Sequence, residues 1–213
     1  MIRDPGRSDV TVVCAEGQRR LVAARSFQPV SDECIAHEEP VMWAPSQYLG
    51  SYRAWIIVQQ ITEDQAKRDW VIAKKFLRTT QVWDEQDQSF AEKFKHVCGM
   101  EIQAVRDLYF SVATNHMGFW DERGYIGGSG LFETLCFTNH SCAPNATVAP
   151  LSGRRGTALR AISKIRPGDE ITWNYFYPND FSRLPVADRR HLTEMEFGFV
   201  CQCVRCQREA EIC

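Results

Sequence analysis

The chain has 213 residues, of which 44% are hydrophobic and 11% aromatic, and its formal net charge at pH 7 is −2. This composition is typical of a folded globular protein, with one substantial core or a small domain carrying an appendage. The small net charge excludes a globally basic nucleic-acid-binding surface, so no direct nucleic-acid partner is expected.

Targeting and membrane signals are not evident in the sequence. Residues 1–13 carry charges throughout and lack an apolar core, so we do not expect a signal peptide. No apolar run approaches the ~20 residues of a membrane helix, and no membrane partner is expected. The nine cysteines then indicate reduced thiols and metal ligation, not disulfides. We expect an intracellular protein, nuclear or cytoplasmic.

The first 44 residues have the pattern of β-strands. Residues 9–14 and 20–25 are β-prone runs separated by a turn at residues 15–18. A polar bend at residues 27–33 follows, and a further short strand is expected between Cys34 and Met42.

From Ser46 the apolar residues recur at helical spacing. One helix is predicted to end near Ile61, and residues 62–65 (TEDQ) have the pattern of a capping box that opens a second. A polar loop is expected at residues 81–88, after which Ser89 would cap a further helical region extending to Val112. These elements form a helical insertion of roughly 60 residues between strand-rich segments.

Strands and glycine turns return after Asn115. The glycines of residues 127–130 (GGSG) are expected to break regular structure, and they lack the lysine of a phosphate loop. Residues 166–169 (RPGD) predict a β-turn, and residues 183–197 predict a short helix with Leu184, Val186 and Leu192 facing inward. Three strands are predicted, at residues 147–151, 157–162 and 170–173. The fold class is therefore α+β, with β-rich parts on both sides of a helical insertion.

The C-terminal cysteines predict a metal site. Cys201, Cys203 and Cys206 can place three thiolates on one turn, which suits tetrahedral Zn²⁺, and a closed structural site needs a fourth protein ligand. We favour Cys142, because it lies in the polar, turn-rich segment 139–145, and we expect the zinc to be structural and not catalytic. The candidates for the fourth ligand are Cys142, Cys136, Cys213, His140 and His191. Core positions are expected for Cys14, Cys34, Cys98 and Cys136.

Three motifs together resemble those of SET-domain protein lysine methyltransferases. They are residues 139–145 (NHSCAPN), residues 168–175 (GDEITWNY) and the Cys201-x-Cys203-x-x-Cys206 spacing of the post-SET zinc motif. Leu131 and Phe132, with residues 189–199, look most like the SET-and-MYND subfamily. Neither the zinc-binding MYND insertion nor the subfamily's C-terminal helical domain has a counterpart in the chain; residues 45–112 hold only Cys98.

The resemblance implies a β-rich SET fold in which segments 139–145 and 170–175 thread past each other as a pseudoknot. It divides the chain into N-terminal SET strands (1–44), a helical SET-I insertion (45–115), a C-terminal SET part (116–182) and a post-SET zinc segment (183–213).

The resemblance also implies a function: S-adenosylmethionine-dependent methyl transfer to a lysine of a protein substrate, histone or non-histone. Tyr175 would be catalytic. The cofactor-binding residues would be Gly17, Arg19, Arg20, Asn139, His140, Tyr175 and Phe199. The substrate channel would contain Met117, Phe197 and Tyr177. One structural zinc would be held by Cys142, Cys201, Cys203 and Cys206.

Two positions depart from the family pattern. Arginines follow Gly17 where the family usually has Gly-x-Gly, and Met117 stands where the subfamily has an aromatic residue. Two other hypotheses are a catalytically inactive SET-fold protein-interaction module, which the altered glycine loop favours, and a zinc-only structural domain. The second leaves the match at residues 168–175 unexplained.

Overall fold

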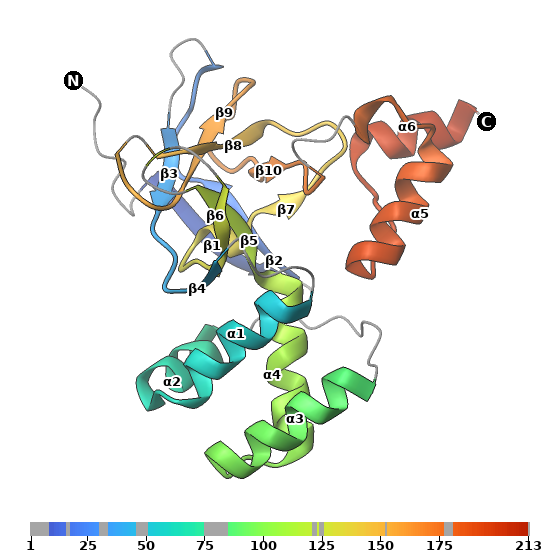
Figure 1. The fold of residues 1–213 in the computed structure, drawn as a ribbon. Coiled ribbons are helices and arrows are strands. Elements are labelled where there is room, and N and C mark those ends of the chain that lie inside the picture. Colours follow the sequence, from blue (N-terminus) through green and yellow to red (C-terminus); the bar gives the residue numbers. More distant parts are fainter. Residues whose placement is uncertain are drawn as a thin grey trace.

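The structure is a computed structural model, and it describes residues 9–15, 18–29, 34–45, 51–74, 85–120, 123, 126–151, 153–176 and 181–212. The strands lie together in one part of the molecule, helices α1–α4 extend from one side of them, and helices α5 and α6 lie on another side (Figure 1). No helix within these ranges is long and apolar enough to cross a bilayer.

The strands form small sheets that combine N-terminal and C-terminal parts of the chain. Strands β1 (Val10–Ala15) and β2 (Gln18–Ala23) form the predicted antiparallel hairpin. A second sheet has the order β3 (Cys34–Glu38), β9 (Thr157–Ala161), β8 (Ala146–Pro150). A third has the order β4 (Met42–Pro45), β6 (Ile126–Leu131), β5 (Met117–Trp120). The strands at residues 146–150 and 157–161 confirm two sequence predictions, and the pairing of β3 with β9 unites sequence regions on either side of the insertion.

The glycine-rich segment 127–130 lies inside strand β6, so the prediction that it breaks regular structure was wrong. A Cβ atom on Gly130 would lie 2.5 Å from the Cβ of Pro40 and 2.7 Å from the carbonyl oxygen of Met42. Glycine is therefore needed here because the neighbouring chain approaches too closely for a side chain.

The insertion consists of helices α1 (Ser51–Thr62), α2 (Gln65–Lys74), α3 (Glu85–Cys98) and α4 (Ile102–Asn115). The predicted capping box was wrong, because Thr62 still belongs to α1 and its hydroxyl donates to the Gln59 carbonyl (2.9 Å). Asp64 caps α2 instead: its Oδ1 accepts from the backbone N–H of Ala66 (2.9 Å) and of Lys67 (3.3 Å).

Helix α3 starts earlier than predicted, at Glu85, and Ser89 lies inside it and does not cap it. Acidic residues in its first turn suit the positive end of the helix. The helices bury a core around Trp55, whose indole N–H donates to Asp87 (2.8 Å) and whose ring stacks on Tyr109 (4.6 Å between centroids). Met42 and Leu131 connect this core to strands β4 and β6.

The C-terminal part contains a predicted turn and two helices. Residues 166–169 form the turn, with the Asp169 N–H donating to the Arg166 carbonyl (3.1 Å) and Gly168 at a φ of 89°. Helix α5 (Val186–Phe197) was predicted, whereas helix α6 (Val204–Ile212), which follows within the cysteine cluster, was not. As expected, Leu184, Val186 and Leu192 pack around the buried cysteines Cys142, Cys201 and Cys206.

The other cysteines do not all occupy core positions. Cys14 is exposed, so its predicted burial was wrong: it shares a strand face with the buried Val10 but lies near the turn end of the hairpin. Cys34 and Cys136 are partly buried, and the side chain of Cys98 lies outside the described residues.

Candidate functional site

The site is built where two distant segments cross. Strands β7 (Asn139–His140) and β10 (Thr172–Trp173) pair in parallel, with Thr172 opposite Asn139 and Trp173 opposite His140. The Ser141 N–H extends the pairing by donating to the Trp173 carbonyl (3.0 Å). In Figure 1 these strands lie on the side of the β-rich part that faces α5 and α6. The predicted passage of segment 139–145 beside segment 170–175 is confirmed.

The Asn145 side chain closes this crossing. Its Nδ2 donates to the Glu170 carbonyl (2.8 Å), and its Oδ1 accepts from the Thr172 N–H (2.9 Å). One side chain therefore holds both ends of a short stretch of the opposite segment. Sequence reasoning assigned no role to Asn145; its place as the last residue of the NHSCAPN motif was the available signal.

Two of the predicted cofactor-binding residues, Asn139 and Arg20, contact Glu170. The Asn139 Nδ2 donates to Glu170 Oε1 (2.7 Å) and to the backbone carbonyl of Arg19 (3.1 Å). Arg20 lies 4.0 Å from the second carboxylate oxygen of Glu170. The arginine-bearing strand β2 is thus adjacent to the crossing.

The Arg19 side chain points toward the helical insertion. Its guanidinium donates to the backbone carbonyl of Lys74, the last residue of α2, and lies over the Phe137 ring (5.1 Å to the centroid). A cation at this end of the helix is favourable because the carbonyl dipoles point toward it. Arg19 therefore joins strand β2, the segment before β7 and the insertion.

Tyr175 lies immediately after the crossing and is held by two hydrogen bonds. Its hydroxyl donates to the Thr138 carbonyl (3.0 Å), and its backbone N–H donates to His140 Nδ1 (3.2 Å). Burial raises the pKa of Tyr175 above its usual value of 10, so the hydroxyl is neutral near pH 7.

His140 connects Tyr175 to the cysteine cluster. Burial lowers the pKa of His140 from 6.5 to about 4, so the ring is neutral at pH 7. Because Nδ1 accepts a hydrogen bond from Tyr175, the proton is assigned to Nε2, which lies 3.4 Å from the Cys142 sulfur. The imidazole can therefore donate to that sulfur.

Two phenylalanines from the end of α5 and just beyond it surround Tyr175. The Phe197 centroid lies 5.0 Å and the Phe199 centroid 6.4 Å from that of Tyr175, and Phe199 lies 6.0 Å from His140. Met117, in contrast, is 8% exposed and packs in the core of the β-rich part with Leu135. Two further predicted site residues, Gly17 and Tyr177, lie outside the described residues.

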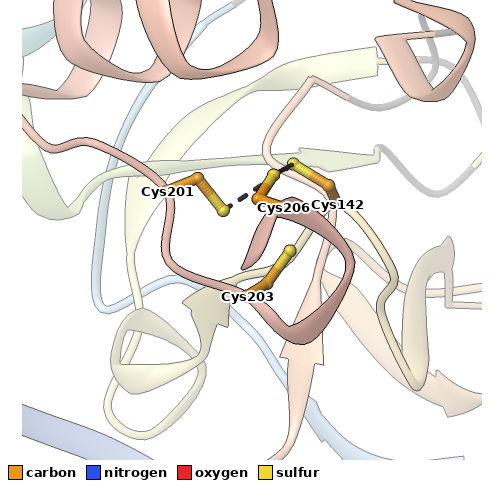
Figure 2. A group of neighbouring side chains, drawn as sticks. All are labelled: Cys142, Cys201, Cys203 and Cys206. Carbon is orange, nitrogen blue, oxygen red and sulfur yellow. Dashed lines mark hydrogen bonds between the residues drawn. The ribbon is translucent and has the colours of Figure 1, made fainter. Parts of the chain in front are cut away.

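Four cysteines converge in the C-terminal part. The sulfurs of Cys142, Cys201, Cys203 and Cys206 all lie within 4.8 Å of one another (Figure 2). The Cys142 sulfur is 3.7 Å from that of Cys201 and 3.5 Å from that of Cys206. Zn–S bonds of about 2.3 Å in a tetrahedron require sulfur separations of about 3.8 Å, so the donor set fits zinc. Hydrogen bonds to Cys201 and Cys203, together with burial, raise the pKa of Cys142, so a set of thiolates here needs a cation between them.

None of the other candidates for the fourth ligand is among the described residues that converge in this cluster. Cys136 and His191 are not members of the cluster, and Cys213 lies outside the described residues. His140 contacts Cys142 but is not one of the converging ligands. The choice of Cys142 agrees with this geometry.

Comparisons with known proteins agree with the architecture. The SET domain family matches residues 21–176. Histone-lysine N-methyltransferase Smyd1 of Mus musculus is 30% identical over 163 residues, which are 71% of this chain and 30% of that protein. Protein-lysine N-methyltransferase SMYD4 of Homo sapiens is 36% identical over 90 residues, 42% of this chain and 11% of that protein. The chain thus spans less than a third of the length of these curated relatives.

A solved structure has the same fold. The crystal structure of the SET domain of LSMT bound to lysine and AdoHcy covers 92% of this chain and 54% of that chain, with a TM-score of 0.55 and 10% sequence identity. The family match spans well over half of the chain and includes both segments of the β7–β10 crossing. The chain therefore belongs to the SET-domain family.

Proposed function

We propose that this protein transfers a methyl group from S-adenosylmethionine to a lysine side chain of a protein substrate. The observation that carries the proposal is the position of the Tyr175 hydroxyl, which is fixed on the Thr138 carbonyl beside the β7–β10 crossing. Membership of the SET family supports it, as do the names of the relatives, which are lysine N-methyltransferases.

The residues around the crossing suit S-adenosylmethionine. When bound, it supplies an activated methyl group that a neutral amine can accept by in-line displacement. We assign its binding to Gly17, Arg19, Arg20, Asn139, His140, Tyr175 and Phe199. Arg20 offers positive charge for a carboxylate, and Phe199 offers an apolar face for a base. The Thr138 hydroxyl is buried and has no hydrogen-bond partner among the described residues, as expected where a polar ligand completes a site.

Tyr175 would orient the substrate amine. Its hydroxyl proton is engaged by the Thr138 carbonyl, so the lone pairs of its oxygen stay available to accept a hydrogen bond from an amine N–H. The raised pKa of Tyr175 keeps the hydroxyl neutral, so its role is positioning of the amine and not proton abstraction by a phenolate.

The substrate lysine must be uncharged to react. We assign its channel to Met117, Phe197 and Tyr177. An apolar wall such as the Phe197 ring disfavours the ammonium form and thereby lowers the lysine pKa. The target protein, histone or non-histone, would then supply the lysine, and the intracellular location, nuclear or cytoplasmic, stays a prediction.

One structural zinc bound by Cys142, Cys201, Cys203 and Cys206 would fix the C-terminal segment. This segment carries Phe197 and Phe199, so the zinc would hold both rings beside Tyr175. We accordingly take residues 1–44 and 116–182 as the two parts of the SET fold, residues 45–115 as the insertion and residues 183–213 as the zinc segment.

The test is calorimetric titration of the zinc-loaded protein with S-adenosylmethionine, followed by an assay of S-adenosylhomocysteine release with lysine-bearing proteins. We expect saturable binding of one equivalent and release that depends on the added protein. An Asn139→Ala variant, which loses the amide at the crossing, is expected to bind more weakly. Binding without turnover would favour the inactive interaction module, and a failure to bind S-adenosylmethionine would overturn the proposed function.

A further inference from the structure

The most completely buried cation among the described residues lies beside the cysteine cluster. Arg189, on helix α5, is 0% exposed and is the largest of the fully buried side chains. Burial of an arginine is costly unless anions compensate its charge, and arginine remains protonated in proteins. Its environment must therefore supply negative charge.

A carboxylate and a cysteine sulfur contact the Arg189 guanidinium. Its Nη2 donates to Glu209 Oε2 on helix α6 (2.6 Å) and to the Cys206 sulfur (3.5 Å). Its Nη1 donates to the Leu184 carbonyl, while its Nε has no partner among the described residues.

The Glu209 carboxylate alone does not compensate the positive charge of Arg189. Its side chain is 35% exposed, and its other carboxylate oxygen is bound by Arg205 at 2.6 Å. One carboxylate is thus shared by two arginines. The remaining negative charge can come from the cluster, because four thiolates around one divalent cation keep a net negative charge.

We propose that Arg189 is the counter-cation of the tetrathiolate zinc site, and that its contact with Cys206 strengthens zinc binding. This inference rests on the zinc assignment in the proposed function. The sulfur of a zinc-bound thiolate accepts a charge-assisted hydrogen bond from arginine, so the 3.5 Å contact between Arg189 Nη2 and the Cys206 sulfur would stabilise the zinc-bound site. Arg189 is a positioning residue that acts through this ligand.

The neighbouring arginine provides a matched control. Arg190 also reaches the cysteine segment, but its Nε and Nη2 donate to the backbone carbonyls of Cys201 (3.2 Å) and Cys206 (3.3 Å) and not to sulfur. Removal of Arg190 therefore removes hydrogen bonds to the same segment, while the charge next to the thiolate stays.

The experiment measures zinc affinity of the full chain by competition with a chromophoric chelator, with folding checked by circular dichroism. Arg189→Met is expected to weaken zinc binding by about 10- to 100-fold, the range typical of groups that support metal ligands. Arg189→Lys, which keeps the charge, and Arg190→Met are expected to stay within about threefold of the wild type.

A Glu209→Gln variant separates this role from a purely structural one. If Arg189 compensates the thiolates, loss of the competing carboxylate should leave zinc affinity within about threefold of the wild type. If Arg189 matters only through its ion pair with Glu209, then Glu209→Gln will lose as much affinity as Arg189→Met, and the proposal is wrong. An unchanged affinity of Arg189→Met would overturn it equally.

Two further outcomes are distinguishable. Should Arg189→Met fail to fold, Arg189→Gln, which also removes the charge, takes its place: a loss of about tenfold or more in Arg189→Gln but not in Glu209→Gln supports the proposal, and unchanged affinity in Arg189→Gln rejects it. A wild-type chain that binds no zinc would instead overturn the zinc assignment in the proposed function.

Discussion

Replacement of Asn145 by alanine tests whether one side chain holds the β7–β10 crossing together. The two strands contain two residues each, so their own ladder supplies few hydrogen bonds. The Asn145 side chain adds bonds to the Glu170 carbonyl and the Thr172 N–H. Its backbone carbonyl, which accepts from Ile162 and Ser163, is unaffected by the substitution.

The expected cost follows from these two bonds. Each hydrogen bond contributes about 0.5–1.5 kcal/mol net, and a buried partner left unpaired adds about 1–3 kcal/mol. Glu170 and Thr172 are partly buried, so water can replace part of what is lost. We therefore expect Asn145→Ala to lower the free energy of unfolding by about 2–3 kcal/mol, a large share of the roughly 5–15 kcal/mol typical of folded proteins.

Urea denaturation of the zinc-loaded protein measures this change. Asn145→Asp keeps an acceptor for Thr172 but places a carboxylate oxygen against the Glu170 carbonyl, so a loss at least as large as that of Asn145→Ala is expected. Asn174→Ala is the matched control, because its side chain makes a local bond to the Phe176 N–H and does not bridge the two segments. A cost below about 0.5 kcal/mol for Asn145→Ala, or an equal cost for the Asn174 control, would refute the reasoning.

Four other changes have defined outcomes. Tyr175→Phe should lower turnover by about 10²- to 10⁴-fold with an unchanged circular dichroism spectrum, because the group that orients the amine is lost; near wild-type turnover would remove Tyr175 from catalysis. Cys142→Ala should release the zinc, as measured by metal analysis, because a closed site needs four ligands; one zinc retained per chain would contradict this ligand choice. Gly130→Ala should destabilise the fold by about 1–3 kcal/mol through overpacking. Gly118→Ala should cost less, because its added Cβ would meet nothing closer than 3.9 Å, and the denaturation midpoints of the two variants measure the difference in stability. Burial raises the pKa of Cys136 from 9.0 to about 12, so its stabilising effect is complete below pH 9 and is lost as the pH rises toward 12. Between pH 8 and pH 10, the free energy of unfolding of the wild type should therefore fall by about 1.5 kcal/mol more than that of Cys136→Ala. Equal losses in the two proteins would show that Cys136 does not titrate in this way.

Local sequence patterns determined much of this protein because they encode local geometry. The spacing of Cys201, Cys203 and Cys206 places three thiols on one turn, and the structure brings them together as expected. The hairpin of β1 and β2, the turn at residues 166–169 and helix α5 likewise follow from short-range preferences. In each case, the residues that form the structure are neighbours in the chain.

Competing local signals explain several wrong predictions. Asp64 caps α2, while the Thr62 hydroxyl is bonded within the preceding helix. Cys14 is exposed near the turn end of its hairpin, although Val10 on the same strand face is buried, and an apolar run does not reveal this difference. Gly130 lies within a strand, and it is glycine because the close approach of Pro40 leaves no room for a side chain there. The capping error was thus a matter of local competition, whereas the environments of Cys14 and Gly130 were decided by tertiary structure.

The site itself was decided by contacts between segments far apart in the sequence. The motifs indicated that residues 139–145 and 170–175 belong to one site, but only the fold pairs Asn139 with Thr172 and gives Asn145 its two bonds across the crossing. Arg189 and Arg190 look alike in the sequence, yet a helical turn of 3.6 residues points them in different directions. One guanidinium is buried against the sulfur of Cys206 and the other binds backbone carbonyls. Such differences arise from the packing of α5 on α6 and the cysteine cluster, which local spacing does not specify.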